Sequence, residues 1–236
     1  MASTINNLAS CHFDLHQYDK SLHQFQRSLD IYLKLRSRKD PLSIELSKVY
    51  NNMGLCYFEK QNYSEAYNHF QLSCSLINND NVDFRAKLLN GIALCQSKLN
   101  CFSQALQSFQ KLLDLQKILL GEDATNEDIA KTLHNTGHCF LVLDTNPKSA
   151  LENYHQSFKM TKQIFGDKHE KVVSCVNSIR NCFKSMSSID NNMQRRNSLQ
   201  KQSVEIFQRK QVDFGAQWNT CTNPVIYQML TTKYRK

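Results

Sequence analysis

Apolar residues recur along this chain at intervals of three and four, which is the spacing of one face of an α-helix. Polar residues interrupt the pattern at regular points, for example at Asn62, at Asn100 and in the stretch "TNPK". Helices joined by short polar turns fold back on one another as antiparallel pairs. We predict helix pairs over residues 2–15 and 18–37, 42–60 and 63–78, 81–99 and 102–120, and 125–143 and 147–165.

A repeated set of small and aromatic residues lies on these predicted helices. Small residues let two helix backbones approach closely, and a large ring fills the space beside the contact. One such two-helix unit cannot bury its own apolar face, so the units must stack on each other. The set begins at Ala9/Cys11, Gly54/Cys56, Ala93/Cys95 and Gly137/Cys139, and continues as Tyr18, Ser21 and Phe25, then Tyr63, Ala66 and Phe70, then Phe102, Ala105 and Phe109, and in the fourth unit as Ala150 and Tyr154.

A fifth unit is weaker, because it keeps Cys182 but has Arg180 in place of the small residue. We predict an all-α, right-handed superhelical solenoid of about five helix pairs over residues 1–187. Residues 188–211 are predicted to form a capping helix, whose apolar residues cover the open end of the stack. Residues 212–236 form a basic tail that is either disordered or folded back onto the array. Helix starts are expected at Asp40-Pro41 and Asn126-Glu127, and left-handed helix caps at Gly121 and Gly166.

Composition supports a helical protein and argues against several other classes. Of 236 residues, 41% are apolar, and only six Gly and three Pro occur, which disfavours a loop-rich β fold. The sequence has no apolar run of the ~18 residues needed to span a membrane and no signal-peptide pattern, so we expect a cytoplasmic protein. Nine Cys without a C-x-x-C pair indicate reduced thiols rather than a disulfide framework or a zinc motif.

The net charge of +8 lies mostly at the C-terminal end. Residues 195–236 hold eight Lys or Arg and two Asp or Glu, so the rest of the chain is nearly neutral. A general nucleic-acid-binding surface on the helical array is therefore not indicated. The basic C-terminal segment leaves nucleic acid or acidic lipid as an alternative partner for that segment alone.

The repeated residues resemble those of the tetratricopeptide repeat family over roughly residues 2–187. The units are longer than the common form of ~34 residues. They are similar to the kinesin light chain and nephrocystin type of about 42 residues. The resemblance rests on "INNLA", "YNNMG" and "LHNTG" in the first helices and on the links "LGEDATNEDIA" and "FGDKHEKVV". The links lack the His-Pro pair of that type, and the chain shows no long coiled coil or motor-binding heptads.

This resemblance implies that the first helix of each pair lines a concave groove that holds extended peptides. An Asn amide both donates and accepts hydrogen bonds, so it matches a peptide group without preference for sequence. The alternatives are that these residues tie one repeat to the next or face water. The predicted peptide-binding residues lie two and three positions before each small residue: Asn6, Asn7, Asn51, Asn52, Asn90, His134, Asn135 and Asn177.

Lys48, Lys87 and Lys131 lie one helical turn before the Asn positions, and therefore on the same face. A basic row beside an Asn row favours an acidic peptide or one that presents its C-terminal carboxylate. The alternative is a solvated helix face, on which Lys is common.

Other residue types have less specific explanations. Two His pairs, His12/His16 and His134/His138, have the spacing of half a zinc site, but no third ligand is evident and we predict no metal or cofactor. The "RRNS" stretch ending at Ser198 resembles a basophilic kinase site. The recurrent Cys residues suit packing as small apolar side chains better than redox chemistry. The aromatic residues Phe13, Tyr57, Phe58 and Phe140 suit either groove pockets or inter-repeat core.

From these observations we expect a protein–protein interaction scaffold or adaptor, not an enzyme, because no phosphate loop, nucleophile elbow or acid pair occurs. The partner is an extended and acidic peptide segment held in the groove. One alternative is a structural subunit of a cytoskeletal or ciliary assembly, whose groove is filled by its own tail or by another chain. The other alternative is binding of nucleic acid or acidic lipid through the C-terminal segment.

Overall fold

The computed structural model of this protein describes residues 1–35, 43–77, 81–121, 124–143 and 146–186, and every regular element in these ranges is a helix. The chain divides into two compact units, Met1–Phe183 and Lys184–Lys236, and nearly all the described residues belong to the first. The predicted capping helix over 188–211, the tail over 212–236 and Ser198 lie outside the described residues. The helices are α1 (Ala2–Asp14), α2 (Tyr18–Leu35), α3 (Ser43–Glu59), α4 (Tyr63–Ser75), α5 (Val82–Lys98), α6 (Phe102–Leu120), α7 (Glu127–Leu143) and α8 (Pro147–Phe165), followed by a helical segment over 170–186.

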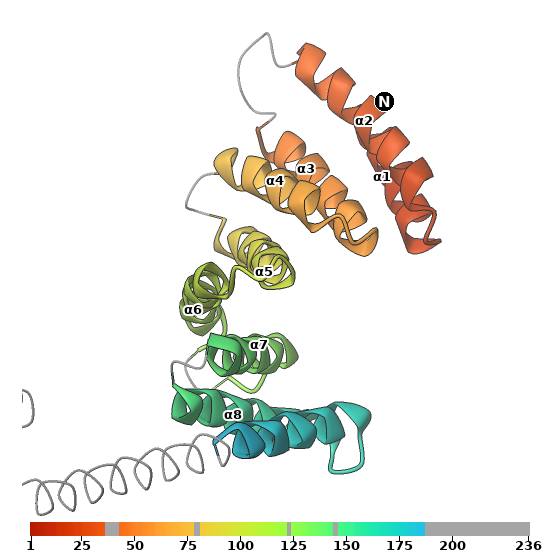
Figure 1. Ribbon diagram of the computed structural model, residues 1–236. Coiled ribbons are helices and arrows are strands. Elements are labelled where there is room, and N and C mark those ends of the chain that lie inside the picture. The colour runs from red at the N-terminus through yellow and green to blue at the C-terminus, as the bar shows by residue number, and fades with distance from the viewer. Residues whose placement is uncertain (36–42, 78–80, 122–123, 144–145, 187–236) are drawn as a thin grey trace, which may run out of the picture. The chain divides into compact units, whose positions relative to one another are not determined.

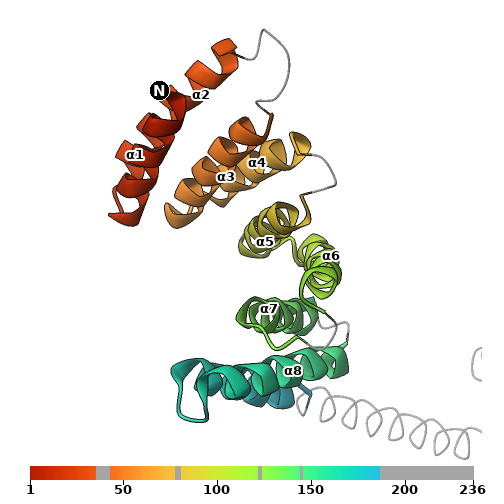
Figure 2. The same ribbon diagram turned by 180° about the vertical axis from the view of Figure 1, so that it is seen from behind.

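The helices form antiparallel pairs that stack in chain order. Within each pair, the first helix packs against the second, as α1 does on α2 and α7 does on α8. The second helix of one pair then packs against the first helix of the next, as α4 does on α5 and α6 does on α7. Figures 1 and 2 show this succession from two sides. The predicted all-α solenoid of helix pairs is confirmed, and its boundaries agree with the predicted ranges within a few residues.

The repeated small and aromatic residues form the centre of each unit. Phe70 is 1% exposed and lies between two glycines, one in its own unit and one in the next. A Cβ atom placed on Gly54 would lie 2.9 Å from Cδ1 of the Phe70 ring, and one placed on Gly91 would lie 2.8 Å from Cε2. Gly137 similarly faces Tyr154, at 3.1 Å from its Cδ1. The small residues are therefore required by the rings, as the repeat pattern predicted.

The turn inside each of the first three helix pairs uses a left-handed residue at the same repeat position. His16, Gln61 and Asn100 have φ values of 56°, 61° and 61°, although none of them is glycine. The next amide bonds back across the helix end, as when Asn62 N–H donates to the carbonyl of Tyr57 at 2.9 Å. This is the hydrogen-bond pattern of a Schellman cap. Asn62 then caps α4, because its side chain accepts a hydrogen bond from the Glu65 amide.

A buried serine hydroxyl joins the two helices of three units, a feature that the sequence pattern did not predict. Ser28 donates to the carbonyl of Ala2 at 2.9 Å, and Ser157 donates to the carbonyl of Ala130 at 2.7 Å. In the second unit, Ser47 and Ser73 each donate to the other's carbonyl, at 2.8 and 2.7 Å. The third unit has no such bond to a backbone carbonyl at this repeat position, because the corresponding residues are the apolar pair Ala86 and Leu112. Its helices are joined instead by the Ser108 hydroxyl, which donates to the side-chain oxygen of Gln96 at 2.7 Å.

Two predictions about local structure need correction. Four of the recurrent cysteines are buried, but Cys11 is exposed. These thiols face the preceding unit, as the 3.4 Å contact from Cys56 to Ser21 shows, and no described unit precedes α1. The second correction concerns the two glycine caps. Gly121 and Gly166 do have positive φ, at 94° and 78°, but their ψ values of 156° and 169° place them in a positive-φ region that is essentially restricted to glycine, rather than in the left-handed helical one.

Three of the four aromatic residues whose role was left open belong to the inter-repeat packing. Phe13 packs against the core cluster of the first two units. Tyr57 and Phe58 pack against the cluster that contains Phe70. Phe140 is half-buried on α7. For the first three of these residues, core packing is therefore the interpretation that the contacts support.

Candidate functional site

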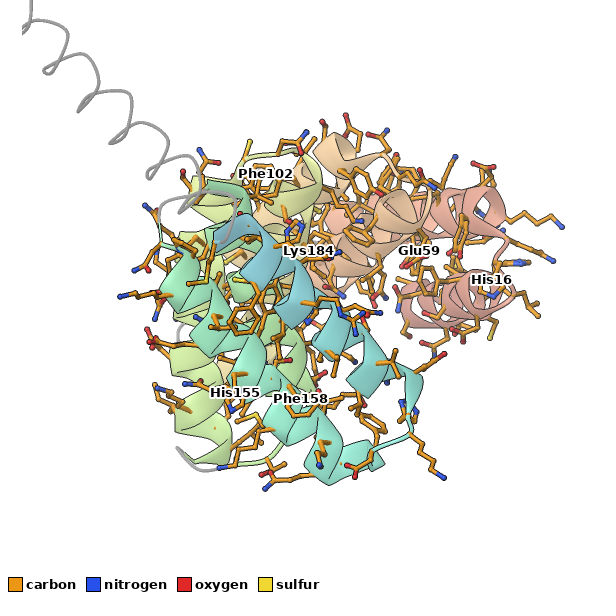
Figure 3. The ribbon with its side chains drawn as sticks, turned by 60° about the horizontal axis from the view of Figure 1, so that its bottom comes forward. His16, Glu59, Phe102, His155, Phe158 and Lys184 are labelled. Atoms are coloured by element: carbon orange, nitrogen blue, oxygen red, sulfur yellow. The ribbon has the colours of Figure 1, made fainter. Side chains whose placement is uncertain are left out.

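A pocket of about 630 Å³ lies among α5, α6, α7, α8 and the helix over residues 170–186. Figure 3 brings the end of the array that carries α8 forward and labels His155 and Phe158 on that helix. A volume of this size is typical of sites that hold a small molecule or several side chains of a partner. Five of the predicted peptide-binding residues line it: Lys87, Asn90, Lys131, His134 and Asn135.

The pocket combines an apolar interior with a few polar side chains. Leu112 and Ala130 are buried in its wall, and Leu119 and Leu120 are partly exposed at the end of α6. Buried polar side chains lie among them, including the amide of Gln116. Small-molecule and peptide sites commonly have this composition, because apolar area supplies affinity and the few polar groups set orientation.

The basic side chains of the pocket are each paired with a carboxylate. Lys87 Nζ lies 2.7 Å from Asp83, one helical turn earlier. Lys131 Nζ lies 2.8 Å from Glu127, and Lys171 Nζ lies 2.7 Å from the same carboxylate. The hydrogen bonds from these two lysines lower the pKa of Glu127 to about 2. The basic row is therefore largely neutralised here, which removes much of the physical basis for preferring an acidic peptide.

His134 contacts the fifth unit rather than projecting freely into the pocket. Its Nε2 lies 3.4 Å from the hydroxyl of Ser178, and its Nδ1 lies 3.9 Å from the thiol of Cys175. Its ring meets Tyr154 edge-on at 5.1 Å. Burial, and then the nearby His138, lower the pKa of His134, so its neutral form is favoured. These contacts support the alternative in which this position ties one repeat to the next.

The other predicted peptide-binding residues do not line this pocket. Asn7, Lys48 and Asn177 are exposed, and Asn177 accepts a hydrogen bond from Arg180 at 3.1 Å. Asn51 and Asn52 are half-buried and bond to each other at 3.2 Å. The side-chain oxygen of Asn6 is buried without a hydrogen-bond partner. The structure therefore brings together the residues of the third and fourth units and leaves those of the first two apart from them.

The pocket also contains residues from the second helices, which the sequence interpretation did not consider. Gln116 and Thr161, on α6 and α8, both lie in its wall. A signal for Gln116 was present, because the same repeat position holds Tyr32 in the first unit and Ile77 in the second. The fourth unit holds Thr161 there, so the position is apolar in the first two units and polar in the two units whose helices line the pocket.

Glu127 links the fourth unit to the fifth, so we expect Glu127→Gln to loosen the helix over 170–186. In hydrogen–deuterium exchange, the backbone amides of residues 172–183 should exchange several-fold faster. The reason is that the uncharged glutamine side chain no longer forms ion pairs with Lys131 and Lys171. A carboxyl with a lowered pKa stabilises the fold fully above its ordinary value of 4.5, and this contribution is lost as the pH falls towards about 2. The control is Glu152→Gln, an exposed carboxylate on α8. Equal exchange in both variants would contradict the link.

The part of the chain that the structure describes contains neither a metal-ligand cluster nor a membrane-spanning helix. No three His, Cys, Asp or Glu side chains in it lie close enough together to hold a metal ion. None of its helices is both long and apolar enough to cross a membrane.

Comparison with known proteins places this architecture among tetratricopeptide arrays. The family model described as "Tetratricopeptide repeat" matches residues 1–76. No curated protein matches the sequence significantly. Several solved structures share the fold, with TM-scores of 0.61 to 0.66.

Three of these structures illustrate the likeness. BtubC (BKLC) from P. vanneervenii has a TM-score of 0.63 at 15% identity, over 94% of this chain and 83% of that one. A putative kinesin light chain from Podosopora anserina with nearly identical TPR-like repeats has 0.62 at 11% identity, over 89% and 95%. The apo form of RapI has 0.66 at 12% identity, over 93% and 78%. Residues 1–76 thus match the tetratricopeptide repeat family, and the chain has the fold of TPR-like repeats such as those of the kinesin light chain structure.

Proposed function

We propose that this protein is an interaction scaffold that holds an extended segment of a partner protein across α5 and α7, in the pocket described above. TPR-like arrays are typical of protein–protein interaction scaffolds, and each unit of such an array presents its first helix in the same way. The observation that carries the proposal is the convergence of Asn90 and Asn135, from successive units, on one pocket with an apolar interior. Their side-chain amides can pair with the backbone of an extended peptide.

The charge of the partner segment is a separate question. An acidic segment stays a prediction, which rests on Lys48, Lys87 and Lys131. The ion pairs of Lys87 and Lys131 weigh against it, because an incoming carboxylate would have to compete with Asp83 and Glu127. Six charged side chains line the pocket, three basic and three acidic, so its formal charge is zero. We therefore propose that the pocket itself has little preference for an acidic segment.

The proposal is tested with linear peptides selected by phage display on the full-length protein and then measured by fluorescence polarisation. The double variant Asn90→Ala/Asn135→Ala should weaken binding by about 10-fold to 30-fold, because it removes two hydrogen bonds worth about 1 kcal/mol each. The matched control is Asn68→Ala/Asn181→Ala, which changes two exposed amides outside the pocket. Loss of affinity in both double variants, or in neither, would count against the proposed site.

Salt dependence separates the two views of charge. An acidic segment held by the lysine row should bind more weakly at high salt, because added ions screen exposed charges. A segment held by amide hydrogen bonds and apolar contact should bind almost equally at low and high salt. A steep salt dependence would restore the acidic-peptide prediction.

A further inference from the structure

Gln116 is a buried amide whose oxygen has no partner. The residue is 7% exposed, its side chain lines the pocket, and its Oε1 accepts no hydrogen bond. Gln96, also in the third unit, is buried to the same degree at 8% exposed, but its Oε1 accepts a hydrogen bond from Ser108 at 2.7 Å. Leaving a buried acceptor unpaired costs free energy, so an unpaired acceptor on a pocket-lining side chain is a candidate for a hydrogen bond to a ligand.

The other repeats act as an internal reference for this position. Tyr32 in the first unit and Ile77 in the second occupy the place of Gln116, and both pack against the apolar cores of their units. The fourth unit has Thr161 there, a polar residue whose hydroxyl donates to the carbonyl of Ser157 at 2.7 Å and is therefore paired. Folding of a unit therefore does not require an amide there. The third unit also lacks the bond from a serine hydroxyl to a backbone carbonyl that Ser28 and Ser157 form in the first and fourth units, since Leu112 and Ala86 occupy those positions. Gln116, Leu112 and Ala86 all line the pocket, so the third unit departs from the repeat at the same place where the pocket forms.

The surroundings of Gln116 restrict the chemistry of its missing partner. The lysines of the pocket are already paired with Asp83 and Glu127. A charged ligand group would therefore have to break one of these ion pairs or be buried without an opposite charge. Burying an unpaired charge is far more costly than burying a neutral polar group. Leu112, Leu119 and Leu120 add apolar surface near the amide. The ligand group that fits is uncharged, carries an N–H or O–H, and has apolar carbon beside it.

We propose that Gln116 determines the specificity of this pocket: its amide oxygen, which is buried in the free protein, turns into the pocket and accepts a hydrogen bond from an uncharged side chain of the partner segment. This inference rests on the proposed function. The donor belongs to a side chain such as Asn, Gln, Ser or Thr, whose carbon atoms pack on Leu112 and on the two leucines at the end of α6. Segments with a purely apolar side chain at that point leave the Gln116 oxygen unpaired and bind more weakly.

The test uses the same selected peptides on the full-length protein and on Gln116→Leu. In the free protein, the leucine removes an unpaired buried acceptor, so the Tm is expected to rise by about 2–4 °C. In the complex it removes a hydrogen bond, so peptide affinity is expected to fall by about 10-fold. The control is Gln96→Leu, which leaves the Ser108 hydroxyl unpaired and should lower the Tm. A higher Tm together with a weaker peptide affinity is a result that a merely structural role of Gln116 does not produce.

A double-mutant cycle then locates the donor on the peptide. Each Asn, Gln, Ser or Thr of the bound peptide is replaced by an apolar residue of similar shape, such as Thr→Val. One replacement should weaken binding about 10-fold on the wild-type protein and leave binding to Gln116→Leu unchanged. A Tm that falls in Gln116→Leu, or an affinity that does not change, overturns the inference.

The failure of this inference differs from the failure of the proposed function. Peptides that need Asn90 and Asn135 but ignore Gln116 overturn the inference and leave the proposed function standing. If no selected peptide binds the wild-type protein, both are overturned.

Discussion

Phe70→Ala is expected to lower the free energy of unfolding by about 3–5 kcal/mol, the range measured when a fully buried Phe is truncated in a core. The ring is 1% exposed and fills the space between Gly54 and Gly91, so its removal opens a cavity between two units as well as within one. Glycines on both sides have no side chains that could move into that cavity. The site therefore collapses poorly, which places the cost towards the upper part of the range.

Urea denaturation followed by circular dichroism measures this loss, and hydrogen–deuterium exchange shows where it acts. The protection of α3, α4 and α5 should fall most, because each repeat contacts only its neighbours. Leu72→Ala is the control on the same helix, since Leu72 is 47% exposed and should change stability by about 0.5 kcal/mol or less. A loss for Phe70→Ala no larger than that of the control would show that the ring does not hold the two units together.

Gly91→Val is expected to lower the free energy of unfolding by about 2–3 kcal/mol. A Cβ atom at this position would lie 2.8 Å from two carbons of the Phe70 ring, closer than real Cβ contacts allow. The better helix propensity of valine over glycine offsets only a few tenths of a kcal/mol of the overpacking cost. Asn90→Val is the control, because it places the same side chain on the adjacent exposed position of α5.

The same clash makes a specific double-mutant prediction. Phe70→Leu shortens the side chain that Gly91→Val strikes, so the loss caused by Gly91→Val should be smaller in that background. Coupling energies between contacting residues of about 0.5–3 kcal/mol are typical. If the losses of unfolding free energy caused by the two substitutions simply add, the valine fits without pressing on Phe70. The close approach of α5 to Phe70 would then not explain why residue 91 is a glycine.

The existence and bounds of the helices followed from local features of the sequence. Apolar spacing, Asn62 at a helix start and the small residues Gly54 and Gly137 all act within one helix pair, over a few tens of residues. The prediction that these units stack follows from the area that a single pair cannot bury. The positive φ of His16 and Gln61 was not predicted, because a non-glycine residue enters that region only when the surrounding helix ends require it.

The candidate site was predictable only in part. The sequence placed Lys87, Asn90, Lys131 and Asn135 on first helices, and the structure brings them to one pocket. The sequence could not reveal that Glu127 would bind Lys171, which lies 44 residues later, because such a pair depends on how one unit packs against the next. The charge of the pocket therefore depends on these pairs as well as on the lysines that the sequence shows.

What the sequence by itself determined is the kind of protein: helix pairs of repeated design, which must stack because none can bury its apolar face alone. What only the tertiary structure decided is where the array departs from its own repeat. Gln116 appears in the sequence as a polar residue at a position that is apolar in the first two units, and its unpaired oxygen exists only in the folded stack. The physical reason is that periodicity is a property of one helix, whereas the pairing of a buried polar group depends on every helix that surrounds it.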